Sequence, residues 1–137
     1  MNREIKFREY NSHWKKMYAP FTLINAITAG GISDRYNNHS IFMQYTGIKD
    51  INGVEIYEGD ILSLSRCNPK EYKVGFIEGA FCLCFINGIW KNHYALDMNY
   101  IQRSLKKKSE VAGNIYENPE LVDNLNKDLG TTPKNSR

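Results

Sequence analysis

The segment Met43–Leu64, MQYTGIKDINGVEIYEGDILSL, contains the signals that decide the fold. The pair Asn52-Gly53 lies between β-branched residues, which predicts a tight hairpin turn whose two central residues both have positive φ. Gly59 precedes Asp60 at a second bend, where a left-handed backbone costs glycine nothing. The last residues of the segment, ILSL, follow this bend as a strand. The segment therefore predicts short strands joined by sharp turns, as in a small β domain.

The N-terminal region predicts a hairpin. Apolar and charged residues alternate in Arg3–Tyr10 (REIKFREY), which is typical of a strand with one buried face, and Ile5 and Phe7 are expected on that face. Trp14–Tyr18 is expected to return as the second strand. The segment Phe21–Ala29 is apolar and β-branched, and both a helix and a strand remain open for it.

Short strands and glycine-bearing turns continue toward the C-terminus. Strands are expected at residues 41–45, 60–65, 72–77, 81–86, 89–94 and 110–115, and residues 54–56 are expected to begin the ordered segment that follows the first of them. Helical spacing predicts a short helix within 97–106, and Asn118-Pro119 predicts a C-terminal helix with Asn as its N-cap and Pro at its first position. This pattern favours a mainly β fold, a small bent sheet or partly open SH3-like barrel with an N-terminal hairpin and a short C-terminal helix. We expect one domain over 1–126 and a polar tail over 127–137.

The composition is that of an ordinary globular protein. The chain has 137 residues, of which 42% are hydrophobic and 24% charged, and its formal net charge of +3 is too small to imply a polyanionic partner. The odd number of cysteines, Cys67, Cys82 and Cys84, predicts reduced thiols in the cytoplasm, with Cys82 and Cys84 on one face of a strand. No apolar stretch approaches the roughly 20 residues of a membrane span, so we expect no membrane partner.

Three segments together resemble the YopX family of phage and prophage proteins. They are REIKFREY at Arg3–Tyr10, MQYTGIKDINGVEIYEGDI at Met43–Ile61 and VAGNIYENPEL at Val111–Leu121. They follow the family's order and span nearly the whole chain, and the Glu-Ile-Tyr-Glu-Gly-Asp run is specific. The resemblance implies a mainly β protein that is encoded in phage or other mobile DNA and expressed inside a bacterial host. It implies no activity and no catalytic residue set.

An acidic set lies around the two bends, and two interpretations of it compete. The carboxylates of Asp50, Glu55, Glu58 and Asp60 are the groups that a metal ion or an acid–base mechanism requires. Carboxylates beside turns also accept hydrogen bonds from backbone N–H groups, and we expect this structural role here. The residues of the expected structural corners are Asn52, Gly53, Tyr57, Gly59, Asp60, Tyr116, Asn118 and Pro119.

No other pattern indicates an enzyme or a cofactor. His13, His39 and His93 are separated by long stretches without a ligand at metal-binding spacing, so we expect surface or loop histidines and no metal site. The cysteines lack a partnered base, and the chain has neither a Gly-x-Ser-x-Gly elbow nor a phosphate-binding loop. We therefore expect a protein that is not an enzyme and that carries no cofactor.

Two binding hypotheses remain. The first is a phage accessory protein that acts by assembly, most simply as a homo-oligomer and otherwise with a host or phage protein, because open sheet edges and many tyrosines suit protein contacts. The second is a nucleic-acid-binding regulator of phage replication or expression, which would combine aromatic stacking with phosphate contacts. Its candidate contacts are Trp14, Lys15, Lys16, Arg103, Lys106, Lys107 and Lys108.

Overall fold

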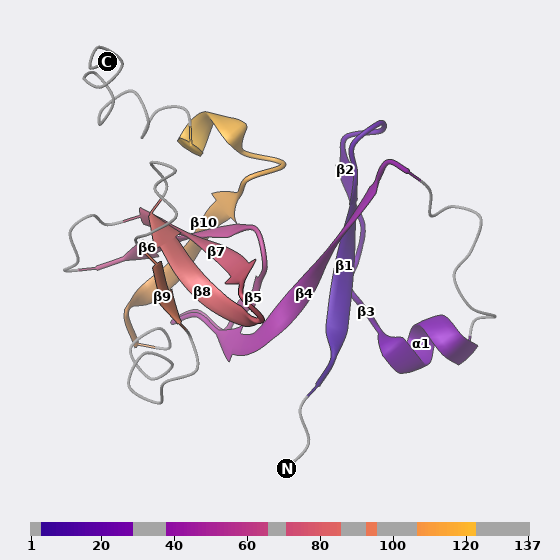
Figure 1. Ribbon diagram of the computed structural model, residues 1–137, viewed down its shortest axis with the longest axis horizontal. Coiled ribbons are helices and arrows are strands. Elements are labelled where there is room, and N and C mark those ends of the chain that lie inside the picture. The colour runs from indigo at the N-terminus through magenta and orange to yellow at the C-terminus, as the bar shows by residue number, and fades with distance from the viewer. Residues whose placement is uncertain (1–3, 29–37, 66–70, 86–92, 96–106, 123–137) are drawn as a thin grey trace.

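Ten strands form two five-stranded antiparallel sheets in the computed structural model, which describes residues 4–28, 38–65, 71–85, 93–95 and 107–122 (Figure 1). The first sheet contains β1 (Lys6–Asn11), β2 (Lys16–Met17), β3 (Phe21–Thr22), β4 (Ser40–Lys49) and β5 (Glu55–Tyr57). The second contains β6 (Asp60–Leu64), β7 (Glu71–Ile77), β8 (Ala80–Phe85), β9 (His93–Ala95) and β10 (Ser109–Asn114). The helix α1 (Leu23–Thr28) follows β3, and a helical turn at 119–122 follows β10.

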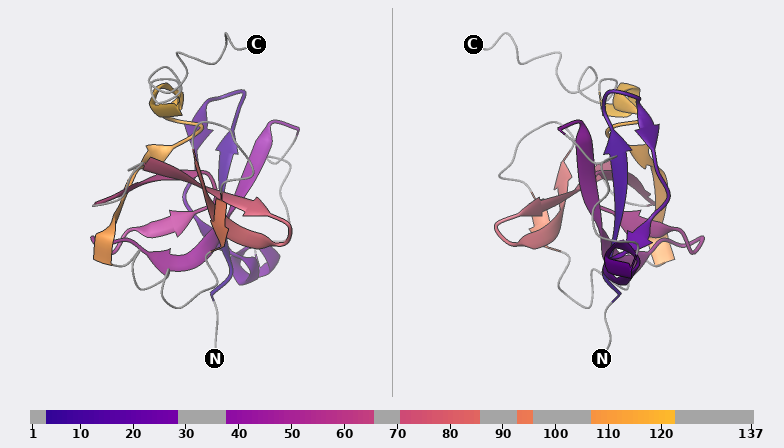
Figure 2. Two further views of the ribbon diagram at one scale, coloured as in Figure 1. Left: turned by 60° about the vertical axis from the view of Figure 1, so that its left-hand side comes forward. Right: turned by 90° about the vertical axis from the view of Figure 1, so that its right-hand side faces the viewer.

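The strand order is β2-β1-β4-β5 in the first sheet, with β3 also paired to β1, and β10-β6-β7-β8-β9 in the second. The predicted mainly β fold with an N-terminal hairpin and a short C-terminal helix is confirmed. The second sheet curls into a half-barrel, which is compatible with the partly open SH3-like barrel that the sequence predicts (Figure 2). Within the described ranges, no helix has the length and apolar character needed to cross a membrane.

The long strand β4 belongs to both halves of the molecule. Its first half pairs with β1, from Phe7↔Gln44 to Asn11↔Ser40, and its second half pairs with β5. The main apolar core lies between this second half and the curled sheet, and Ile56 and Leu62 are fully buried within it. Among the described residues, the buried members of this cluster are Ile48, Ile56, Leu62, Leu64, Tyr72, Val74 and Leu83.

Both faces of β1 are partly covered: its contacts with the corner come from the face opposite to the predicted one, while Glu9 and Asn11 on the predicted face are buried. The side chains of Lys6, Arg8 and Tyr10 contact residues of the corner, whereas Ile5 is 43% exposed and Phe7 is half-buried. Alternation defines two faces of a strand but does not say which one is covered. Here Lys6 pairs with the partly buried Glu55 of β5 and Arg8 pairs with the buried Asp60 of β6, so the cationic face contacts the body and the prediction that Ile5 is covered is wrong.

The β1–β2 hairpin is shorter than the predicted return strand at 14–18. Within that stretch, Lys16 and Met17 pair with β1 and the Tyr18 N–H donates to the Glu9 carbonyl at 2.8 Å, because residues 12–15 form the turn. The buried side chain of Asn11 holds this turn, since its Oδ1 accepts the backbone N–H groups of His13 at 3.0 Å and Trp14 at 2.9 Å. Trp14 is 68% exposed at the tip.

Residues 21–28 contain both structures that the sequence left open. Phe21–Thr22 forms β3, and Leu23–Thr28 forms α1. The change occurs at a reciprocal capping contact: the Asn25 N–H donates to Thr22 Oγ1 at 3.0 Å, and the Thr22 N–H donates to Asn25 Oδ1 at 3.2 Å. Such a capping box satisfies two backbone donors at the start of a helix.

The Asn52-Gly53 turn differs from the prediction. Of the two residues, only Gly53 has positive φ, and the flanking pair is Lys49↔Glu55, so the connection is wider than a two-residue hairpin. The Asp50 side chain holds this wider connection by accepting the backbone N–H groups of Asn52 and Val54, both at 2.8 Å. The side chain therefore supplies the geometry that two positive φ angles would otherwise provide.

The C-terminal helical turn begins at Pro119 as predicted, but Asn118 does not cap it with its side chain. The Asn118 carbonyl accepts the Leu121 N–H at 3.0 Å, while its side-chain Oδ1 turns back and accepts the Asn114 N–H at 3.1 Å. A Cβ at Gly113 would lie 2.5 Å from this oxygen, so the contact requires glycine there. The expected helix within 97–106 and most of the strand at 89–94 lie outside the described residues.

Candidate functional site

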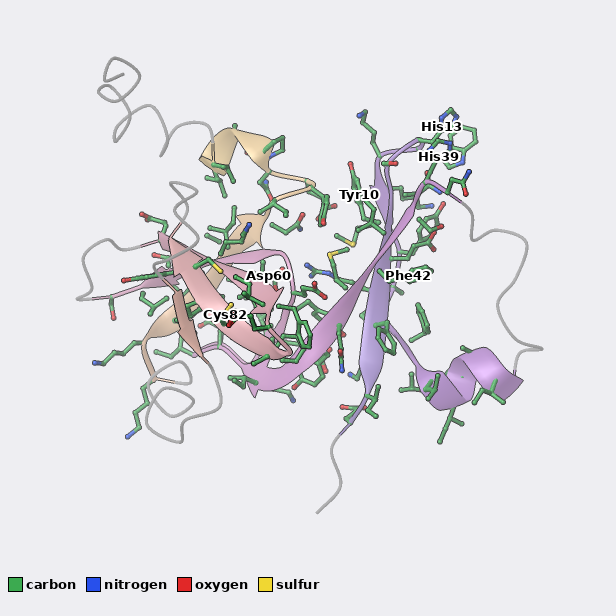
Figure 3. All side chains as sticks on the ribbon, viewed as in Figure 1. Tyr10, His13, His39, Phe42, Asp60 and Cys82 are labelled. Carbon is green, nitrogen blue, oxygen red and sulfur yellow. The ribbon has the colours of Figure 1, made fainter. Side chains whose placement is uncertain are left out.

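The two sheets meet at the bend between β5 and β6, where Asp60 is 1% exposed (Figure 3). One carboxylate oxygen of Asp60 accepts the backbone N–H of Tyr57 at 2.8 Å, and the other accepts a hydrogen bond from the Arg8 guanidinium at 2.6 Å. Arg8 also lies over the Tyr57 ring, 4.7 Å from its centroid. Both oxygens of Asp60 are thus engaged in holding the bend and the first sheet together.

The environment of this ion pair is poor in water. Burial raises the pKa of the Asp60 carboxyl, because the loss of hydration outweighs the attraction of Arg8. Within the described part of the chain, the buried Nε of Arg8 has no hydrogen-bond partner. The pair therefore has the burial of an active-site group, but the contacts of Asp60 are those of a structural cap.

A second ion pair, between Lys6 and Glu55, lies beside the first. The Tyr57 hydroxyl donates to Glu55 at 3.0 Å, so this buried tyrosine binds a carboxylate and not the backbone group that corner tyrosines commonly use. Burial acts to raise the pKa of Glu55, but the hydrogen bonds from Lys6 and Tyr57 outweigh it and hold that pKa below its ordinary value. Burial and the neighbouring Glu55 raise the pKa of the Tyr57 hydroxyl.

The other two acids of the set also contact backbone. Asp50 accepts a third N–H, from Val111 of β10, at 2.9 Å, which ties the β4–β5 turn to the second sheet. Glu58 accepts the Gln44 N–H at 3.4 Å. Among the described residues, no group of three or more His, Cys, Asp or Glu side chains could hold a metal ion. The four acids are therefore distributed along the junction as acceptors for backbone and cationic groups.

Gly59 allows the close packing at the corner. Its φ is +88°, and a Cβ there would lie 3.3 Å from the Tyr116 ring and 3.4 Å from the sulfur of Met43. Tyr116 stacks on Tyr10 of β1 with ring centroids 5.3 Å apart. The backbone of Gly59 also joins the second sheet, since its N–H donates to the Val74 carbonyl at 2.8 Å.

The turns that follow Tyr57 and Tyr116 are built differently, although each comes after the same run Ile-Tyr-Glu, at 56–58 and 115–117. At the second one, Asn114 Oδ1 accepts the backbone N–H groups of Tyr116 at 3.0 Å and Glu117 at 2.7 Å. At the first, Asp60 follows the tyrosine and makes the ion pair. Each turn is held by a side-chain acceptor, but the first acceptor is the charged Asp60 after the tyrosine and the second is the neutral Asn114 before it.

The predicted basic residues do not form one surface. Lys15 and Lys16 lie at the tip of the β1–β2 hairpin, whereas Lys107 and Lys108 precede β10 of the second sheet, and the views in Figures 1 and 2 place these segments at opposite ends. Arg103 and Lys106 lie outside the described residues. A continuous basic groove over both clusters is therefore not formed by the described lysines.

The pairing of β1 with β4 brings together two histidines that are distant in sequence. The ring centroids of His13 and His39 are 5.2 Å apart, and Trp14 packs edge-on against His13 at 4.7 Å. The sequence placed these histidines in separate loops. Their proximity follows from the register between β1 and β4, which cannot be read from the spacing of residues in the sequence.

The two described cysteines lie on one face of β8, as expected for residues two apart on a strand. Cys82 and Cys84 are both free and buried, with sulfur atoms 3.6 Å apart. Burial raises the pKa of the Cys82 thiol to about 12. These are the properties of unreactive core thiols. Cys67 lies outside the described residues.

Sequence reasoning missed an exposed apolar surface, which we call the outer apolar face. It consists of Ile5, Leu23, Ile24, Ile27 and Phe42, which are exposed by 43, 50, 70, 65 and 43% respectively. The ring of Phe21, in the strand that directly precedes α1, lies beside Phe7 and Phe42, with centroid distances of 6.1 and 6.3 Å. In Figure 1, α1 lies on the side of β1 that faces away from the second sheet.

Comparisons with known proteins identify a family and a fold. The model of the family described as YopX protein matches residues 2–123. None of the curated proteins matches the chain. A solved structure, that of protein EF1440 from Enterococcus faecalis, is similar with a TM-score of 0.57 and 24% sequence identity, over 88% of this chain and 99% of that one. At this identity the likeness shows a shared fold.

Proposed function

The chain belongs to the YopX protein family, and we propose that it is a phage or prophage accessory protein that acts by self-assembly and not by catalysis. The observation that carries this proposal is the outer apolar face. We place its action in the cytoplasm of the bacterial host, where its reduced thiols would be stable. The proposal treats the buried acids as the means of holding the two sheets together.

The composition of α1 supports assembly. Three of its six residues, Leu23, Ile24 and Ile27, are large apolar side chains exposed by half or more. A surface helix normally turns its apolar positions toward the core, so this exposure has a free-energy cost that a partner would remove. Exposed apolar surface, when it is contiguous, marks interaction sites on soluble proteins.

A second copy of the chain is the partner that this face suits best. The described members of the face are all uncharged, so no partner of opposite charge is required for complementarity. In a twofold dimer the same patch lies on both sides, and an apolar patch is complementary to itself. The isolated position of the lysine pairs argues in the same direction, because they do not combine into a binding surface for a polyanion.

The oligomeric state tests this proposal. We expect sedimentation velocity and light scattering to show an oligomer that dissociates on dilution, and Ile24→Glu and Ile27→Glu to give monomers that stay folded. Ile51→Glu is the matched control, because Ile51 is 53% exposed but lies in the β4–β5 turn, outside the outer apolar face. A native chain that stays monomeric at several hundred micromolar, or an equal effect of Ile51→Glu, would contradict the proposal.

A nucleic-acid-binding regulator of phage replication or expression is the second candidate, and the hairpin tip favours it. Trp14 is 68% exposed beside Lys15 and Lys16, a combination that can stack on a base and contact a phosphate. Binding to single-stranded or duplex oligonucleotides would then weaken with added salt and be lost in Trp14→Ala. If the chain does not bind these oligonucleotides even at low salt, the nucleic-acid candidate is excluded, and the assembly proposal is not affected.

A further inference from the structure

The tip of the first sheet holds a pair of histidines whose arrangement suits a metal ion. His13 belongs to the β1–β2 turn and His39 precedes β4, and both are exposed (Figure 3). Their ring centroids are 5.2 Å apart and their planes are inclined by 34°. This pair plays no part in the outer apolar face or in the ion pairs of the corner.

We propose that His13 and His39 form a two-histidine site for a divalent transition-metal ion with tetrahedral preference, represented by Zn²⁺. A neutral imidazole nitrogen binds Zn²⁺ at about 2.0–2.1 Å, and the ring centre lies roughly 1.2 Å beyond that nitrogen. Two imidazoles at a tetrahedral angle on one ion therefore have centroids about 5.2 Å apart. The observed separation has this value, so the two rings already lie at the spacing that ligation of one ion requires.

The backbone on both sides of the pair is already held in place. The Ser12 N–H donates to the His39 carbonyl at 2.9 Å, and the buried Asn11 accepts the N–H groups of His13 and Trp14. Binding to ordered segments loses less conformational entropy than binding to a flexible loop. The ion would connect the hairpin turn to the start of β4. The adjacent residues Asn11 of β1 and Ser40 of β4 are already paired.

The expected site is weak and exchangeable. No third His, Cys, Asp or Glu joins the pair among the described residues, so water completes the coordination. The neighbouring Lys15 and Lys16 carry positive charge that opposes a cation. Because both ligands must be neutral imidazoles, binding should weaken as the pH falls. Trp14 packs against His13, so its fluorescence should report the ion.

Titration calorimetry of the tag-free full chain with ZnCl₂ tests the site. Loss of one outer-shell partner of a metal ligand typically lowers metal affinity 10–100-fold, and loss of a ligand itself should cost at least as much. His13→Gln and His39→Gln should therefore each weaken Zn²⁺ binding by at least about tenfold. The double variant should be no weaker than either single one, since one histidine alone does not chelate. His93→Gln is the matched control and should bind as the native chain does.

Fluorescence provides an independent measurement. Zn²⁺ should change the emission of the native chain and of His93→Gln, and this change should disappear in Trp14→Phe, which leaves Trp90 as the remaining tryptophan. Circular dichroism verifies that each variant is folded. Zn²⁺ affinity that survives His13→Gln or His39→Gln, an equal loss in His93→Gln, or no binding at millimolar Zn²⁺ would overturn the proposal.

Discussion

The Arg8 guanidinium donates to the Asp60 carboxylate at 2.6 Å, and this contact joins residues that lie 52 positions apart in the sequence. Arg8 belongs to the first sheet and Asp60 to the second, and Asp60 is almost completely buried. Since Asp60 also accepts the Tyr57 N–H, one side chain fixes both the local bend and the contact between the sheets.

Breaking this ion pair from one side should strongly destabilise the fold. Arg8→Met leaves the Asp60 carboxylate buried without its cation, which typically costs about 3–5 kcal/mol. Arg8→Met combined with Asp60→Asn removes both charges and keeps an acceptor near the Tyr57 N–H, so it should lose less than the sum of the single changes. Urea unfolding of the four chains measures this coupling. Additive losses would show that the pair does not act as a unit.

The acid dependence of stability should include a contribution from Glu55. Its pKa is held below the ordinary value in the fold, so its stabilisation is present above the unfolded value of about 4.3 and is lost as the pH falls through the folded pKa. Glu55→Gln should therefore have a flatter dependence of Tm on pH in acid. The raised pKa of Asp60 makes a contribution of opposite sign to the pH dependence of stability. Asp60 is present in both chains, so this contribution cancels when their Tm curves are compared. Parallel curves would contradict the prediction.

Replacement of Gly59 should cost more than replacement of a glycine with the same backbone angle in open space. Gly59→Ala has a strained φ of +88° and brings a Cβ against Tyr116 and Met43. Gly79→Ala is the matched control, because its φ is +83° and nothing lies within 4 Å of its Cβ. We expect a loss of about 1 kcal/mol for Gly79→Ala and a larger one for Gly59→Ala, measured by denaturant unfolding. Equal losses would mean that the aromatic packing adjusts freely.

The thiols of Cys82 and Cys84 should be inert in the folded protein. Both are buried, and the raised pKa of Cys82 leaves little thiolate at neutral pH, so a thiol-specific reagent should modify them only after unfolding. A Cys67→Ser chain removes the third thiol from the measurement. The absorbance of the released chromophore, measured with and without denaturant, then gives the number of reactive thiols among Cys82 and Cys84. Rapid reaction of either one without denaturant would show that β8 opens readily.

The amino-acid sequence by itself determined the class of fold and the positions of its main bends. Strand periodicity, the glycine at 59 and the Pro119 helix start act through neighbours in the chain, and each has its expected place in the structure. Asp50 and Asp60 accept nearby N–H groups for the same local reason. Local signals of this kind need no knowledge of how distant strands pair.

Tertiary structure alone decided which face of β1 contacts the corner, which cation neutralises Asp60, and that His13 lies beside His39. A period of two makes both faces of a strand available, and burial selects one of them only when a partner is present. The β1–β4 register and the bend at Gly59 supply those partners from distant parts of the chain. The outer apolar face has the same origin, because α1 is held on the far side of β1 by the pairing of β3.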